Sequence, residues 1–279
     1  MDFIIEVMAA FGGGVFASII GGTNAFIFTG VTGLIGLALS ISTQNSLALD
    51  TIASGPLFGP HVAFNSGVVA LAIVKRRQIA KNNDINGTNT FLSLYKFKDT
   101  LATLAAGLTG ITGYLLNLFL SRNLQLQLDT VALTIVICNI LTRILIGKVG
   151  IIPQKNLSDR FENVNKSLIY NILIGIALSM IFSYVSITLK TPLFGFYISA
   201  LSLILLSFGK EIPASHHISL VAGYAAIASN NFIIGTLFGA ISCILGEYFN
   251  NLVNSEADTL IDMPSTMIAL LSFIIFMIF

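Results

Sequence analysis

The sequence has few charged residues and no tryptophan. Only 10% of its 279 residues are Asp, Glu, Lys or Arg, whereas soluble domains carry about 25%. Hydrophobic residues make up 55% of the chain, and the mean hydropathy is +0.88. This composition excludes an ordinary soluble domain and predicts an integral membrane protein. The net charge of +1 gives no reason to expect a nucleic-acid partner.

Cysteine and catalytic motifs are also scarce. The two cysteines, Cys138 and Cys243, lie inside apolar runs, so we expect packed hydrophobic side chains rather than a disulfide or a cysteine metal site. No phosphate-binding P-loop, Ser-His-Asp order or His-Glu-x-x-His motif occurs. We therefore expect no enzyme activity, no cofactor and no ATP coupling within this chain.

Apolar runs predict an all-α, polytopic membrane protein of about ten helices. Two of these runs, Pro60–Val74 and His216–Ser229, are short. A helix over Pro60–Val74 is about 22 Å long, less than the roughly 30 Å of hydrocarbon that it would have to cross. Both are therefore candidate broken or re-entrant helices. The predicted helices lie near residues 3–20, 25–42, 57–74, 100–120, 129–147, 167–187, 191–208, 214–229, 232–249 and 263–279.

The Lys and Arg residues predict the orientation in the membrane. Loops 75–99 and 148–166 hold ten of the fourteen basic residues, and basic loops stay in the cytoplasm. Both termini are then expected outside, in a prokaryotic cytoplasmic (inner) membrane. Loop 75–99 is polar and is expected to be mobile. Arg143, near the cytoplasmic end of its helix, is expected to extend its guanidinium to the membrane interface.

A histidine motif occurs twice. Residues 61–72 and 217–228 both read His-x5-Gly-x2-Ala-x-Ala, and all three histidines of the chain lie at these two places. Asp-Thr also follows Gly110 and Gly239 at the same distance of nineteen residues. The chain therefore divides into a first repeat, 1–147, with the basic loop 75–99 inserted, a cytoplasmic linker, 148–166, and a second repeat, 167–279. Five helices per repeat is an odd number, so the second repeat enters the membrane inverted.

This arrangement resembles the five-plus-five inverted-repeat secondary transporters. In those proteins, discontinuous helices meet near the middle of the bilayer and form the substrate and ion sites. The phrases Phe58-Gly59-Pro60-His61-Val62-Ala63-Phe64 and His216-His217-Ile218-Ser219-Leu220 look like those of uncharacterised prokaryotic multi-pass membrane proteins. That second resemblance implies a family but no activity.

Ionisable residues within membrane spans are costly and are therefore candidates for function. His61 and His217 are expected to begin the two short helices, where free backbone N–H groups favour an anion. Asp129 and Asp258 are either part of the site or ordinary helix N-caps, and Asp262 opens the last helix. Polar residues nearby complete the candidate substrate or ion site, which comprises His61, Asn65, His217, Asp129, Asp258, Asp50, His216 and Asp262.

The leading hypothesis is a secondary transporter of a small solute or ion, with proton or cation coupling through a carboxylate or histidine. A passive channel uses the same parts. A metal-dependent membrane enzyme and a membrane assembly subunit are further alternatives. The expected partners are the lipid bilayer and the transported solute, and the glycine-rich helix faces are compatible with internal packing or with a homodimer.

Overall fold

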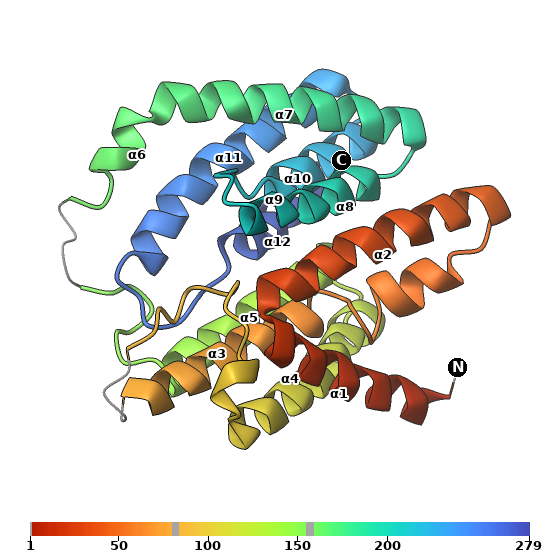
Figure 1. The fold of residues 1–279 in the computed structure, drawn as a ribbon. Helices are drawn as coiled ribbons and strands as arrows, with labels where there is room; N and C mark the ends of the chain where they lie inside the picture. Colours follow the sequence, from red (N-terminus) through yellow and green to blue (C-terminus); the bar gives the residue numbers. More distant parts are fainter. Residues whose placement is uncertain (1, 80–83, 155–158) are drawn as a thin grey trace.

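The structure, a computed structural model, describes residues 2–79, 84–154 and 159–279. Within these residues the chain is helical, with twelve α-helices and no β-strand (Figure 1). The predicted all-α class is therefore confirmed for the described part. Residues 80–83 and 155–158, which belong to the two predicted basic loops, lie outside it.

The helices form two groups along the sequence. The first comprises α1 (Phe3–Ile20), α2 (Gly22–Thr43), the π-helical turn η1 (Leu49–Ala53), α3 (Ala63–Ile79), the short turn η2 (Tyr95–Phe97), α4 (Thr100–Leu118), the π-helical turn η3 (Phe119–Asn123) and α5 (Thr130–Leu145). The second comprises α6 (Glu162–Lys166), α7 (Leu168–Leu189), α8 (Leu193–Ser202), α9 (Ile204–Ser207), α10 (His216–Ala228), α11 (Phe232–Asn254) and α12 (Met263–Ile278). Each of the ten predicted ranges overlaps at least one of these helices.

The two short helices behave differently from each other. α10 has 13 residues, as short as predicted. α3 begins only at Ala63 and continues past the basic residues to Ile79. Pro60 has no backbone N–H, so a regular helix could not run through it from residue 57. The backbone N–H groups of Val62 and Ala63 both donate to the carbonyl of Gly59. His61 therefore lies in a turn before α3, and the prediction that it begins a helix is wrong.

Five helical segments are long and apolar enough to cross a membrane. They are α1, α2, the continuous segment Thr100–Asn123, α7 and α11. α5, α8–α9 and α12 are shorter apolar helices. Large apolar side chains such as Met8 and Leu173 are exposed on the outer faces of α1 and α7, as lipid-facing surfaces require. These observations support a membrane protein, and the full set of ten spans remains a prediction.

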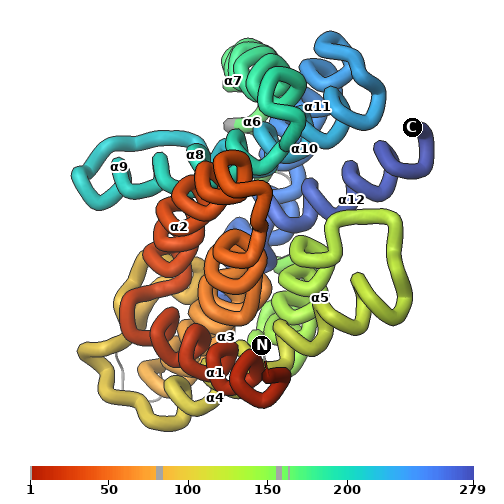
Figure 2. Tube along the Cα trace, turned by 90° about the vertical axis from the view of Figure 1, so that its right-hand side faces the viewer, coloured from red at the N-terminus to blue at the C-terminus, as the bar shows by residue number. Residues whose placement is uncertain are grey.

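Small residues allow the helices to pack closely within each group. α1 packs along α4, and α7 packs along α11. A Cβ atom on Gly110 would overlap the carbonyl of Ala10, and one on Gly239 would overlap the hydroxyl of Ser179. In both views α1, α3 and α4 gather at one side of the molecule, and α7, α10 and α11 at the other (Figures 1 and 2).

The two groups meet at two helix pairs, α2 with α8 and α5 with α12. In the first pair, Gly33 lies directly against the ring of Tyr197 and Gly30 against the backbone of α8. The glycine pattern of the sequence therefore serves internal packing at these positions.

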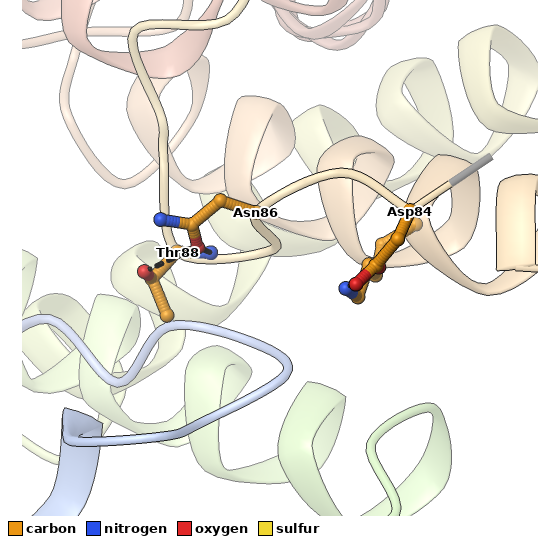
Figure 3. Close-up of polar contacts among 4 residues, drawn as sticks. Asp84, Asn86 and Thr88 are labelled. Atoms are coloured by element: carbon orange, nitrogen blue, oxygen red, sulfur yellow. Dashed lines mark hydrogen bonds and ion pairs between the residues drawn. The ribbon is translucent and has the colours of Figure 1, made fainter.

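The polar segment after α3 is attached to the start of α2. Thr90 accepts a hydrogen bond from the backbone N–H of Thr23 at 3.0 Å, and the two hydroxyls are 2.7 Å apart. Upstream, Asn86 Oδ1 accepts bonds from the N–H and the hydroxyl of Thr88, and Lys75 pairs with Asp84 (Figure 3). The described part of this predicted mobile loop is thus anchored and reaches the interior of the molecule.

Arg143 is buried, so the prediction that it extends to the membrane interface is wrong. Its side chain is 1% exposed. Nε donates to the hydroxyl of Thr259 at 2.6 Å, and Nη1 donates to the carbonyl of Val253 at 2.9 Å. Further bonds reach Asn254 and the carbonyls of Gly150, Ile151 and Thr259. The guanidinium therefore joins the end of α5 to the segment that connects α11 and α12.

Replacing Arg143 should destabilise the fold strongly. We expect Arg143→Met to lower the free energy of unfolding by about 3 kcal/mol or more, because it leaves several buried acceptors without a donor. Arg143→Lys should lower the free energy of unfolding almost as much, since an ammonium cannot donate to several separate acceptors as the planar guanidinium does. Unfolding in detergent measures both, with Arg76→Met on the exposed end of α3 as the control. A loss equal to that of the control would contradict this account.

Candidate functional site

A cavity of about 680 Å³ lies between the two groups of helices. Its wall takes residues from α2, α5, α8, α10, α11 and α12, from the turn before α3 and from the anchored segment 88–91. The volume is within the range of small-molecule binding sites, about 300–1,000 Å³. Three of the predicted site residues, Asp129, His216 and Asp262, line this cavity.

One face of α10 forms part of the wall. His216, Leu220 and Tyr224 all line the cavity, and their spacing of four residues places them on the same side of the helix. His216 is 8% exposed, and its Nδ1 has no hydrogen-bond partner among the described residues. Its ring lies 4.7 Å from that of Phe26, between centroids, in an edge-on arrangement. His217, which the sequence favoured, lies off this wall.

Asp129 and Asp262 cap the helices α5 and α12. Asp129 Oδ1 accepts from the backbone N–H of Ala132 at 2.8 Å, and Asp262 Oδ2 accepts from that of Ser265 at 2.9 Å. Each carboxyl thus satisfies an N–H group three residues along, as N-caps do. Tyr224 adds a hydrogen bond from its hydroxyl to Asp129 Oδ2 at 2.8 Å. Capping and a place on the cavity wall, which the sequence presented as alternatives, therefore coexist.

The two caps are joined reciprocally across the α5–α12 pair. The backbone N–H of Asp129 donates to the Ser272 hydroxyl at 2.9 Å, and that of Asp262 donates to Asn139 Oδ1 at 3.0 Å. Asn139 lies ten residues after Asp129, and Ser272 lies ten residues after Asp262. The two carboxyl groups are consequently about 15 Å apart along the helix axis. They mark two different levels of the cavity.

Asn65 and two of the histidines are buried beside the cavity rather than on its wall. Asn139 Nδ2 donates to Asn65 Oδ1 at 3.1 Å, so Asn65 supports the α5–α12 pair from α3. His61 is 1% exposed, and neither ring nitrogen has a hydrogen-bond partner among the described residues. His217 is 3% exposed and lies close to Gly246 of α11. The structure therefore does not bring His61 and His217 together as the wall of one site.

Asp50 and Asp258 lie elsewhere. Asp50 is exposed and accepts a hydrogen bond from Ser46 at 2.6 Å. Asp258 Oδ2 accepts from the backbone N–H of Lys148 at 2.7 Å, on the side where Arg143 is buried. Asp258 does not cap α12, because Asp262 does. The expectation that Asp258 is an ordinary helix N-cap, like Asp129, is therefore wrong.

Other wall residues were not singled out from the sequence. Tyr197 of α8 shares a 2.6 Å hydrogen bond with Ser54, and both line the cavity. Glu247 of α11 also lines it. Tyr224 could have been predicted, because it lies two helical turns after His216 and therefore on the same face of the helix. No comparable pattern marks Tyr197 or Glu247, whose places depend on how the two groups of helices pack.

The chemistry of the wall is polar and acidic at a few points and apolar elsewhere. Among the described residues, its ionisable side chains are Asp129, Glu247, Asp262, His216 and two tyrosines, with no Lys or Arg. No cluster of three or more His, Cys, Asp or Glu side chains in the described chain could hold a metal ion. The arrangement is suited to binding a small solute and to exchanging protons or cations at the carboxyl groups.

Removing the central amide should weaken the α5–α12 pair. Asn139→Leu leaves Asn65 Oδ1 and the N–H of Asp262 without their partner, so we expect it to lower the free energy of unfolding by about 1 kcal/mol. Thr134→Val is the matched control, since this buried α5 hydroxyl bonds only a carbonyl of its own helix. Equal unfolding midpoints for the two variants would show that the reciprocal bonds contribute nothing to stability.

Comparison with known proteins identifies a family but no activity. No curated protein and no solved structure matches this chain. A family model described as a family of unknown function, DUF7973, matches residues 2–162 and 166–279. This agrees with the resemblance to uncharacterised proteins in the motifs around His61 and His217. Because the match covers nearly the whole sequence, the chain belongs to the DUF7973 family.

Proposed function

We propose that this protein is a secondary transporter of a small solute or ion, with its substrate site in the cavity between the two groups of helices. The observation that carries the proposal is the placing of Asp129 and Asp262 on the wall of that cavity. Asp129 caps α5 of the first group and Asp262 caps α12 of the second, and these two helices pack against each other. A movement of one group against the other would change access to both carboxyl groups, as alternating access requires.

An inverted repeat is part of the proposal, with the first repeat in residues 1–147 and the second in 167–279. The packing of α1 with α4 has a counterpart in that of α7 with α11, and α3 with α4 has one in α10 with α11. In Figure 1, α1 runs from right to left, whereas α7 runs from left to right, so the two helices have opposite directions. The reciprocal bonds of α5 and α12 also fit a two-fold relation.

The proposed topology has both termini outside a prokaryotic cytoplasmic membrane. Lys75 and Arg76 at the end of α3 lie at the same surface hollow as Lys148 and Asp258. The basic residues of the two loops thus converge on one side of the molecule, which suits a cytoplasmic face. By this topology the Ser54 end of the cavity faces outward, and the Asn250 end faces inward.

Transport should require an ion gradient. In proteoliposomes, an imposed proton or sodium gradient is expected to drive accumulation of one class of solute from a panel of amines, amino acids, carboxylates, nucleobases and sugars. Asp129→Asn and Asp262→Asn should reduce this accumulation at least tenfold while leaving the fold intact, because Asn is an equally good N-cap. Equilibration without accumulation, insensitive to the gradient, would indicate a passive channel instead.

The two ends of the cavity should open alternately. With Cys138 and Cys243 replaced by Ala, we expect Ser54→Cys to react with an impermeant maleimide from outside and Asn250→Cys from inside. Conditions that increase one reactivity should decrease the other, because a carrier never opens both ends together. A matched Thr43→Cys variant at the end of α2, outside the cavity wall, should react equally under all conditions. Simultaneous reactivity at both ends would contradict a carrier.

A further inference from the structure

The cavity wall carries acidic side chains without a basic one among the described residues. Its three carboxyl groups come from three different helices, Asp129 from α5, Glu247 from α11 and Asp262 from α12. No Lys or Arg side chain of the described residues lies on this wall. Carboxylates in a low-dielectric site are costly unless an opposite charge is close. The wall is therefore electrostatically suited to a positively charged occupant.

Aromatic rings supply much of the remaining surface. Six aromatic side chains line the cavity: Phe26, Phe64, Phe91, Phe196, Tyr197 and Tyr224. Phe26 and Phe196 pack edge-on, 5.5 Å between ring centroids, and His216 lies against both rings. Aromatic faces attract organic cations and also pack against apolar groups. A small inorganic cation would make little use of this surface.

His216 is a further ring on the wall of the cavity. Its imidazole is more than nine-tenths buried, lies on the wall and has an unpartnered Nδ1 among the described residues. Buried polar groups are normally satisfied. The Nδ1 of His216 is itself buried, as are the unpartnered nitrogens of His61 and the Nδ1 of His217, so His216 contributes its ring to the wall.

An anionic occupant suits the site less well. Helix N-termini attract anions through their free N–H groups. At α5 and α12 one such group already bonds the carboxyl of Asp129 or Asp262, and the N-terminus of α10 at His216 has no side-chain cap. A second anion would meet these carboxylates and Glu247 without a lysine or arginine to bind it. The carboxyl groups of the wall therefore favour a cation over an anion as the occupant.

We propose that the cavity binds small organic cations that carry an aromatic or branched apolar body. The quaternary or protonated nitrogen lies beside the carboxyl group at one of the two levels, and the apolar body packs against the phenylalanine rings. The proposal names the substrate class of the transporter proposed above and rests on that function for its biological meaning. The binding step itself does not require transport.

Two probes of similar shape and opposite charge test the proposal. Benzyltrimethylammonium and phenylmethanesulfonate share a benzyl group and a tetrahedral head. With the full chain in nonionic detergent, calorimetry and thermal unfolding should show saturable binding of the cation and none of the sulfonate. Binding of the sulfonate, or of neither probe, would overturn the proposal.

Substitutions locate the binding to the cavity. Asp129→Asn and Asp262→Asn keep a capping side chain, and the one at the level that holds the nitrogen should raise the Kd of the cation by about tenfold or more. Glu247→Gln, which caps no helix, is a further variant. Asp99→Asn is the matched control, since Asp99 caps α4 by the same bond to the N–H three residues along but is absent from the wall.

The outcomes separate this proposal from the transporter itself. An Asp99→Asn variant that weakens binding as much as the cavity variants would contradict the assigned site. Saturable binding of the cation without flux in proteoliposomes would count against the transporter and support the cation site. Gradient-driven flux of another solute, with no binding of benzyltrimethylammonium, would support the transporter and overturn the cation site.

Discussion

The pairing of α5 and α12 is the constraint on which the central part of the structure depends. Each helix begins with an aspartate whose side chain caps its own helix and whose backbone N–H bonds the other helix. In a membrane interior, an N–H group without a partner would cost several kcal/mol. The two helix starts are therefore fixed relative to each other, and the level of each carboxyl group in the cavity is fixed with them.

The surrounding helices are held by a different kind of contact. Glycine and serine bring α1 against α4 and α7 against α11 at distances that larger side chains would prevent. At the basic side, Arg143 joins α5 to the segment before α12 through several buried hydrogen bonds. The α5–α12 pair is thus held both by the two reciprocal hydrogen bonds and by the Arg143 network at one end. The cavity lies where neither close packing nor this network fills the space between the two groups.

Much of the helical framework could be predicted from the sequence, because membrane helices need long apolar runs. The errors concern residues whose surroundings come from distant parts of the chain. Arg143 lies near the end of its helix, as an interfacial arginine does, but most of its acceptors come from residues more than a hundred positions later. His216 and His217 are adjacent, so only the packing of α10 decides which of them faces the cavity. Asp258 matches Asp129 in sequence, yet local hydrogen bonding assigns the corresponding cap to Asp262.

Helix capping also explains how acidic groups can lie on the wall of an apolar cavity without a basic partner. The partial positive charge at a helix N-terminus stabilises a carboxylate there, which lowers the energetic cost of placing Asp129 and Asp262 on the cavity wall. This stabilisation is partial, and Glu247 within α11 has none of it. Capping therefore holds two of the three carboxyl groups in place and leaves part of their negative charge available to an occupant. A lysine on the wall would have neutralised that charge permanently, whereas in the proposed carrier the capped arrangement leaves it for a cation that binds and dissociates.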